Sequence, residues 1–388
     1  MMHIILSAVQ IVAVIGIISS SLYYILCIWS ASAFLRKAQT SRPEPSSFPP
    51  VSILKPLKGI DPEIYESFRS HCLQDYPEYE IIFGVSDAGD PAIESVRKLQ
   101  EEFPGRRIHL VVCSKILGAN VKVSNLVQML PEAGYEYLIV NDSDIRVETD
   151  YLRRVTAPLD DPRVGMVTCL YRGVSGKTLG SRLEALGIST DFCAGVLVAR
   201  QIEGGIRFGL GSTLAFRRGE LEKIGGFATI LDYLADDYEL GRRISGLGTK
   251  VELSEVVVET YLAPYRLKDF FSHQLRWARG VRDVRKAGHL GLAFTFGIAW
   301  ALLAVVASAG ARWSLAALVF TLLLRWAAAF AIGWRVLRDP QVPKFGWLIP
   351  LRDLFAAANW FVSLAGNTVT WRGDHFRLEH GRLTRIVS

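Results

Sequence analysis

The sequence predicts an α/β domain with a mostly parallel sheet, carried between membrane-spanning helices near both ends of the chain. Half of the 388 residues are hydrophobic, a high share for a soluble enzyme. Long segments without charge lie near both ends. Between them, strand-like and helix-like patterns alternate at the spacing of βαβ units, which indicates a parallel sheet.

Residues 1–35 are predicted to form a transmembrane anchor. No charged residue occurs from Ile4 to Leu35, and about 20 apolar residues can cross a bilayer. A cleaved signal peptide is the alternative, but the segment lacks a basic start and exceeds the roughly 7–15 apolar residues of a signal core. Residues 36–50, which include SRPEPSSFPP, are predicted to be a Pro/Ser linker.

Residues 51–264 are predicted to form the α/β domain. Asp61 and Asp90 each precede a proline at a helix start and are expected as N-caps. Ligands of such sheets bind beyond the carboxyl ends of the strands, where polar clusters occur in this chain. Strands are expected at 51–54, 79–85, 108–113 and 136–140, helices at 62–73, 91–103 and 121–130, and polar clusters at 55–59, 85–87 and 141–144.

The last third of the chain is predicted to return to the membrane. Residues 265–288 are expected to form an amphipathic helix in the membrane interface. Residues 289–371 hold two to three apolar segments, and 372–388 form a basic tail. The apolar side of the amphipathic helix consists of Phe270, Phe271, Leu275, Trp277 and Val281.

Charged residues interrupt two of these apolar segments. Arg325 lies within 313–334, and Arg352-Asp353 breaks 345–371. Ionisable residues in such places are functional-site hypotheses by default. The basic tail is expected on the same side as the central domain, so the broken segment is expected to be re-entrant or interfacial.

The charge distribution favours a membrane partner over nucleic acid. The net charge is +6, and much of the basic excess flanks the membrane segments. This predicts contact with anionic lipid headgroups and places the central domain in the cytoplasm. The five cysteines form no CxxC pair, which argues against a disulfide framework or a zinc site.

Two acidic motifs follow predicted elements of the domain. Asp142-Ser143-Asp144 ends the apolar strand at 136–140; a turn that caps the strand and a site for Mg²⁺ or Mn²⁺ both fit this pattern. Asp236-Asp237 lies in ADDYELG, where a helix N-terminus with acids in its first turn and a catalytic base both fit. No dinucleotide or Walker glycine motif occurs.

Taken in order, the motifs resemble those of inverting GT-A glycosyltransferases of the family 2 kind, which have a Rossmann-like domain. In detail the chain resembles the ceramide glucosyltransferases, glycosyltransferase family 21, including bacterial relatives that act in hopanoid biosynthesis. The matching stretches are VSILKPLKG, DAGDPAI, GANVKVSNL, DSDIRV, LADDY and WRGDHFRL, with SHQLRWARGVRDVRKAGHLGL closer to the hopanoid branch.

The resemblance implies roles for residues on the donor side. Asp87 would contact the uracil of a UDP-sugar. Lys122 and Asn125 would contact the nucleotide or its phosphates. Asp142 would hold the nucleotide ribose, and Asp142 with Asp144 would bind the metal, Mg²⁺ or Mn²⁺.

It also implies the catalytic groups. Asp237, or its neighbour Asp236, would be the base that takes the proton from the acceptor hydroxyl. Arg276 and Trp277 would close over the diphosphate and the acceptor. The neighbouring charge of the acid pair would help to raise the pKa of one member toward working pH.

Two departures from the family pattern concern this site. His273 stands where the motif ending in Arg-Trp usually begins with Gln or Arg, with Gln274 next to it; both are expected to bind substrate. Eukaryotic ceramide enzymes commonly have Asp-Ser-Gly in place of Asp142-Ser143-Asp144. The segment 179–211 fits either an acceptor-binding element or core packing.

The predicted function is transfer of glucose or N-acetylglucosamine from a UDP-sugar to the hydroxyl of a membrane lipid, ceramide or hopanoid, with inversion. The enzyme is expected at the cytoplasmic face of a membrane such as the bacterial inner membrane. The rival hypotheses are a processive polysaccharide synthase, a polyprenyl-phosphate glycosyltransferase, and a membrane-tethered nucleotide-sugar binder without catalysis.

Overall fold

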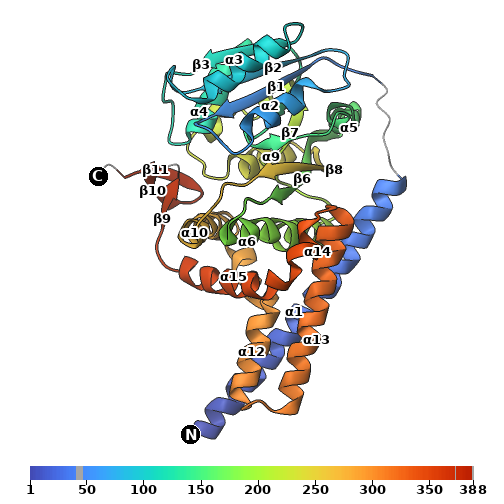
Figure 1. The fold of residues 1–388 in the computed structure, drawn as a ribbon, viewed down its shortest axis with the longest axis vertical. Coiled ribbons are helices and arrows are strands. Elements are labelled where there is room, and N and C mark those ends of the chain that lie inside the picture. Colours follow the sequence, from blue (N-terminus) through green and yellow to red (C-terminus); the bar gives the residue numbers. More distant parts are fainter. Residues whose placement is uncertain (41–46, 372, 387–388) are drawn as a thin grey trace.

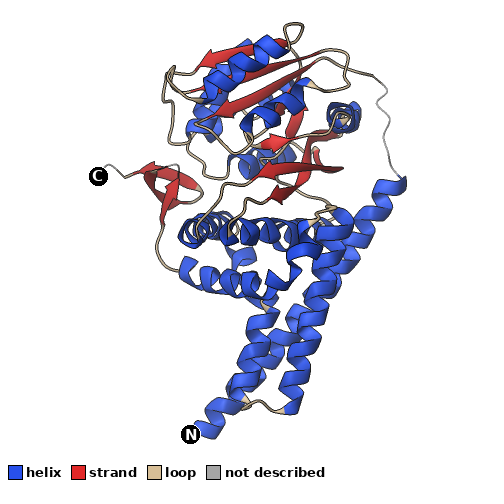
Figure 2. Ribbon diagram, in the orientation of Figure 1, coloured by secondary structure: helices blue, strands red, loops and turns tan. Residues whose placement is uncertain are grey.

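The computed structural model describes residues 1–40, 47–371 and 373–386. An α/β domain lies at one end and a bundle of long helices at the other, with a layer of helices lying crosswise between them (Figure 1). Strands are confined to the domain and to a small sheet beside the crosswise layer (Figure 2).

The domain is built on an eight-stranded mixed sheet of order β3-β2-β1-β4-β7-β6-β8-β5. The first four strands in this order pair in parallel, as predicted, whereas β7 is antiparallel to both of its neighbours. The strands are β1 Val51–Leu57, β2 Tyr79–Val85, β3 Arg107–Val112, β4 Tyr137–Val140, β5 Ile145–Arg146, β6 Val164–Val174, β7 Leu214–Arg217 and β8 Lys250–Tyr261.

Helices flank this sheet. They are α2 Ile64–Cys72, α3 Ala92–Glu102, α4 Val121–Met129, α5 Tyr151–Thr156, α8 Arg218–Lys223 and α9 Asp236–Gly246. The prediction that Asp61 caps the second of the chain's helices is wrong: α2 begins later, after Glu63, and the Asp61 carboxylate accepts a hydrogen bond from Ser143 instead. Asp90 does accept a hydrogen bond from the backbone of Ala92, 2.9 Å, at the start of α3.

The long helices are α1 Met2–Thr40, α12 Gly297–Ala307 and α13 Arg312–Ala329. Among the described residues, three helices are long and apolar enough to cross a membrane, Met2–Gln39, Leu179–Ile202 and Arg312–Val336, or up to four if the bent pair Lys286–Thr295 and Gly297–Ala307 is one span. α1 runs beside α12 and α13 (Figure 1).

The predicted linker 36–50 begins too early. α1 continues through residue 40, and the Lys37 ammonium near its end is 2.5 Å from the Glu252 carboxylate of β8. The linker residues 41–46 lie outside the described residues.

The crosswise layer holds α6 Leu179–Gly187, α7 Cys193–Ile202, α10 Leu267–Val284, α11 Lys286–Gly291, α14 Gln341–Phe345 and α15 Ile349–Ser363. A π-helical turn, Ile188–Phe192, joins α6 to α7. Phe270, on the predicted apolar side of α10, is 1% exposed and packs edge-on against Phe355 of α15, so this side chain is buried within the protein.

A buried ion pair joins this layer to the long helix α13, and a second ion pair lies next to it. Arg325 of α13 forms two hydrogen bonds with Asp353 of α15, 2.7 and 2.9 Å, and donates to the carbonyl of Thr190. The neighbouring Arg352 is 3.0 Å from Asp191. The broken apolar segment 345–371 therefore contains a helix of the crosswise layer, and its charged pair has partners within the protein.

The end of the chain forms a second sheet. The segment predicted to be membrane-bound ends in β9 Thr368–Trp371, and the predicted basic tail forms β10 Asp374–Glu379 and β11 Arg382–Arg385, paired antiparallel. This second sheet was not predicted from the sequence. Arg372 lies outside the described residues.

We expect the Arg325–Asp353 pair to be a main determinant of stability. Asp353→Ala leaves a buried guanidinium without its carboxylate, a loss of roughly 3–5 kcal/mol in buried pairs. The melting temperature of the purified protein in detergent should drop markedly, and Arg325→Met with Asp353→Leu should recover much of it. Arg335→Ala, at an exposed position after α13, is the control; an equal drop in Arg335→Ala and Asp353→Ala would contradict this account.

Candidate active site

The acidic motif Asp142-Ser143-Asp144 follows the carboxyl end of β4, a central strand of the sheet. Asn141 is fully buried, and its side-chain amide donates to the carbonyl of Ser212, 2.6 Å, and to the hydroxyl of Tyr151, 2.9 Å. These bonds fix the end of the strand against β7. The carboxylates of Asp142 and Asp144 follow at once, as the sequence predicts for a ligand site.

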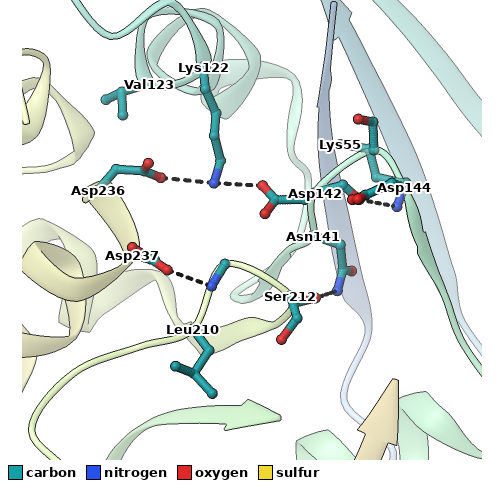
Figure 3. A network of polar contacts seen from close by, with 12 residues as sticks. Lys55, Lys122, Val123, Asn141, Asp142, Asp144, Leu210, Ser212, Asp236 and Asp237 are labelled. Atoms are coloured by element: carbon teal, nitrogen blue, oxygen red, sulfur yellow. Dashed lines mark hydrogen bonds and ion pairs between the residues drawn. The ribbon is translucent and has the colours of Figure 1, made fainter. Parts of the chain in front are cut away.

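Lys122 joins the two acidic motifs. Its ammonium lies 2.7 Å from Asp142 and 2.9 Å from Asp236 (Figure 3). α4 is capped by Asn120, whose side chain accepts from the backbone of Val123. Burial opposes the charge on Lys122, but the two carboxylates outweigh it and raise the pKa of the ammonium. Lys122 is therefore a fixed cation in the middle of the site.

Asp237 is held differently from Asp236. One carboxylate oxygen accepts from the backbone N–H of Gly211, 2.7 Å, and the other from the N–H of Tyr238, 2.8 Å, in the first turn of α9. Burial and the charge of Asp236 raise the pKa of Asp237 to about 6, against the opposing effect of Lys122. Such a carboxylate is poised to exchange a proton near neutral pH.

Gly211 lies between the two motifs, and sequence reasoning missed it. A Cβ at this position would lie 2.7 Å from a carboxylate oxygen of Asp142 and 3.4 Å from one of Asp237. The Gly211 carbonyl also accepts from the backbone N–H of Asp142, 3.3 Å. The only sequence signal was the glycine-rich FGLGS within a segment whose role stayed open.

Lys55 is a second group that was missed as a site residue. It is fully buried, and its ammonium donates to the backbone carbonyl of Asp142, 3.0 Å. Burial lowers the pKa of Lys55 to about 7, against the opposing charges of Asp144 and Asp142. A lysine at the carboxyl end of a buried strand was the available signal.

The donor set suits a hard divalent ion. Asp144 accepts from the Thr260 hydroxyl, 2.5 Å, and burial together with the charge of Asp142 raises the pKa of Asp144 to about 6. A cation would relieve this repulsion. Across residues 1–40, 47–371 and 373–386 no cluster of three or more His, Cys, Asp or Glu side chains could hold a metal. Two carboxylates completed by substrate phosphates and water are a common Mg²⁺ arrangement.

Asp87 follows the end of β2, and Asn125 of α4 contacts the same strand end. Asp87 is exposed, and its carboxylate accepts from the backbone of Gly89, 2.9 Å. Asn125 is 2% exposed; its amide oxygen accepts from the Ser86 hydroxyl, 2.9 Å, and its amide nitrogen donates to the Gly84 carbonyl. Asp87 thus faces solvent beyond the carboxyl end of β2. Asn125 is buried and hydrogen-bonds the end of that strand.

The predicted site residues on α10 contact two different groups of neighbours. His273 and Gln274 contact the carboxylate of Glu184 on α6, at 3.1 and 2.9 Å, and Glu184 is fully buried. Both residues were predicted to bind substrate; in the structure their polar side-chain atoms contact Glu184 of α6. Glu184 was not predicted, since nothing near it in sequence marks it.

Arg276 and Trp277 contact aromatic rings. The Arg276 guanidinium lies 5.9 Å from the ring centre of Trp371 in β9. Trp277 packs against Phe192 at 5.6 Å and His273 at 5.5 Å between ring centres. These rings lie in the crosswise layer and on the small sheet, so α10 joins the site to both.

A curled, mixed sheet with Asp-x-Asp after β4 and an acid pair at the start of α9 defines a glycosyltransferase of the GT-A fold. The chain belongs to glycosyl transferase family 21, whose family model matches residues 12–384. Both the fold and the family predicted from the sequence are thereby confirmed.

Curated relatives are similar over part of their length. Ceramide glucosyltransferase 3 of Caenorhabditis elegans is 24% identical over 71% of this chain and 60% of its own length. The ceramide glucosyltransferase of Komagataella phaffii is 34% identical over 29% of this chain and 23% of its own. The chain thus matches no more than about 60% of these relatives.

A solved structure supports the fold. The mannosyltransferase PcManGT from Pyrobaculum calidifontis, in complex with GDP-Man and Mn²⁺, superposes with a TM-score of 0.56 over 93% of this chain and 100% of that chain, at 23% identity.

We expect Gly211→Ala to disrupt the site while leaving the fold intact. The added methyl group meets the Asp142 carboxylate at 2.7 Å, and displacement of catalytic groups by an ångström can lower turnover by about 100-fold. Glycosyl transfer by the purified protein should fall on that scale with little change in melting temperature. Gly246→Ala on α9, where a Cβ meets nothing within 4 Å, should keep its activity; equal activity of both variants would contradict the role of Gly211.

Proposed function

We propose that the protein transfers glucose or N-acetylglucosamine from a UDP-sugar to the hydroxyl of a membrane lipid, ceramide or hopanoid, with inversion. The reaction takes place at the cytoplasmic face of a membrane, such as the bacterial inner membrane. The carrying observation is that Gly211 joins the two acidic motifs beside Lys122: its backbone N–H donates to the Asp237 carboxylate, 2.7 Å, and its carbonyl accepts from the N–H of Asp142, 3.3 Å.

The residues proposed to bind the UDP-sugar follow the carboxyl ends of the parallel strands. Asp87 is exposed at the end of β2 and can accept hydrogen bonds from a uracil ring. Asp142, whose side chain is 40% exposed, and Asp144 would hold Mg²⁺ or Mn²⁺; such an ion, when bound, neutralises charge on the departing diphosphate. Lys122 adds a fixed positive charge, and Arg276 supplies another from α10.

The choice of base follows from the partners of the acid pair. Asp236 is ion-paired with Lys122 and contacts the Asn120 amide, 3.4 Å. The bonds to Asp237 come from two backbone N–H groups, which leave it free to accept a proton. In the proposed step, Asp237 takes the acceptor hydroxyl proton as the acceptor oxygen bonds to the anomeric carbon and the bond to the diphosphate breaks on the opposite face.

The lipid acceptor is supported by the position of the site. The domain sits on the crosswise layer, and the long apolar helices extend mostly from the other side of that layer (Figure 1). Phe192 and Trp277 lie in this layer, so an acceptor with its chain in the bilayer could present its hydroxyl from that side. A processive synthase would need a translocation channel, and the contacts of the described residues give no support for one.

Mass spectrometry of lipids tests the function. The purified protein is incubated with Mn²⁺ or Mg²⁺, equal UDP-glucose and UDP-N-acetylglucosamine, and equal ceramide and polyhydroxylated hopanoid. A hexosyl or N-acetylhexosaminyl derivative of one lipid is expected. Asp237→Asn should abolish the product and retain UDP binding, because it removes the proton acceptor and keeps the shape. Absence of any glycolipid from the unchanged protein would refute the lipid acceptor, and full turnover in Asp237→Asn would refute the base.

The pH dependence of turnover should report Asp237. Its pKa is raised to about 6, so the base is deprotonated above that pH and lost as pH falls through it. We expect kcat to drop about tenfold per pH unit below pH 6. Asp144 titrates in the same range without metal, so the profile is repeated at tenfold higher Mn²⁺. A profile that moves with Mn²⁺ would assign the loss to the metal ligand instead.

A further inference from the structure

The C-terminal sheet, β9–β11, is a small structure with its own core. Four side chains fill it and are at most 4% exposed: Val369, Phe376, Leu378 and Leu383. Its apolar face packs against Ala119, which precedes α4, and Leu234, which precedes α9. The sheet therefore touches the two segments that lead to Lys122 and to the acid pair.

The C-terminal sheet contacts residues 232–234, the segment just before the acid pair. The backbone N–H of Leu383 donates to the carbonyl of Asp232, 2.6 Å, and the N–H of Leu234 donates to the carbonyl of Gly381, 3.0 Å. Arg382 bonds the Tyr233 hydroxyl, 3.3 Å, and its guanidinium lies 5.2 Å from the Tyr233 ring centre. Residues 232–234 are thus held like an added strand, two residues before Asp236.

The same segment reaches α4. The backbone N–H of Ala119 donates to the Asp232 carboxylate, 2.9 Å, and the Asn120 amide donates to the Tyr233 carbonyl, 2.8 Å. Since Asn120 caps the helix of Lys122, the sheet, the acid pair and the central cation are linked by consecutive hydrogen bonds.

The other contact surface is α10. Arg279 donates to the carbonyls of Thr368, 2.5 Å, and Ala365, 2.9 Å. Arg282 donates to the carbonyl of Gly366, 2.7 Å. The backbone N–H of Gly381 donates to the Asp283 carboxylate, so Gly381 bonds α10 through its N–H and the acid-pair segment through its carbonyl.

We propose that the C-terminal sheet is a positioning element for the transfer reaction. It fixes the base-bearing segment and α10 relative to each other through Gly381, and Trp371 seats the Arg276 guanidinium. This inference rests on the proposed function for the roles of Asp237 and Arg276. Its residues act through these groups, and the sheet's own side chains need not touch substrate.

A matched pair of glycines tests the docking. Gly381 has φ +79°, and a Cβ there would meet Val284 at 3.2 Å; Gly373 in the same sheet has φ +89° with nothing within 4 Å. Alanine at either position carries the same backbone strain, so the difference between the variants isolates the docking contact. Hydrogen–deuterium exchange of the full chain should rise at residues 232–240 and 276–284 in Gly381→Ala only.

We expect turnover to fall in the variant whose hydrogen–deuterium exchange rises. Gly381→Ala is expected to lower kcat tenfold or more with a small change in KM for the UDP-sugar, while Gly373→Ala stays within twofold of the unchanged protein. Equal kcat and equal exchange in the two variants would overturn the proposal, as would exchange that rises throughout the domain. The exchange measurement needs no substrate, so it stands even if no glycolipid forms and the proposed function fails.

A double-mutant cycle tests Trp371. Trp371→Ala should weaken UDP binding in Mn²⁺ by about two- to fivefold, the scale of one cation–π contact, and Trp371→Phe should restore most of it. In an Arg276→Ala background, Trp371→Ala should add nothing, because it acts through the guanidinium. A full additional loss in that background would show that Trp371 only supports the fold. Arg385→Ala, which breaks a pair with Asp374 inside the sheet, is the control and should bind UDP normally.

Discussion

The arrangement of the site depends on one cation, Lys122, whose side chain is 17% exposed. Its ammonium bridges Asp142, from the parallel half of the sheet, and Asp236, from the half that begins with the antiparallel β7. Without it, like charges would crowd together in a region of low dielectric, where their repulsion is strong. The bridge therefore lets carboxylates of the two acidic motifs approach each other closely.

A second set of charged side chains ties α10 to its neighbours in the crosswise layer and to the long helix α13. Arg352 and Asp353 are neighbours on α15, yet they contact different elements: Asp353 pairs with Arg325 on a long helix, and Arg352 contacts Asp191 and the Gln274 amide of α10. Gln274 in turn bonds Glu184 on α6. The helix that presents Arg276 is thus linked by side-chain contacts to α6, α15 and, through Asp353, the long helix α13.

Local patterns in the sequence were sufficient for the parallel half of the sheet. The strand at 79–85 coincides with β2, and those at 51–54 and 136–140 match β1 and β4 closely, because each carries an apolar run bounded by turn residues. The antiparallel half and the C-terminal sheet depend on contacts between distant segments, such as Tyr233 with Arg382. Short alternating strands at the end of an apolar segment give too weak a signal to separate from it.

The site shows the same division. Its carboxylates were predictable because Asp residues after buried strands and at helix starts have a chemical reason to be there. Lys55, Gly211 and Glu184 were not, since their importance lies in what they touch across the fold: a backbone carbonyl, two carboxylates, and the α10 motif. For His273, sequence could supply the residue type but not the direction in which its ring points.

The acid pair shows how the fold assigns separate tasks to adjacent identical residues. Successive side chains on a helix are turned by about 100°, so at the start of α9 Asp236 points to Lys122 while Asp237 points to the backbone of Gly211. The Asp236 carboxylate is held by the Lys122 ammonium, 2.9 Å, and the Asn120 amide, 3.4 Å. Backbone N–H donors orient the second carboxylate with less stabilisation of its charge, and the fixed charge of Asp236 beside it raises its pKa. The neighbour that is committed to the ion pair is therefore part of what makes Asp237 able to take a proton.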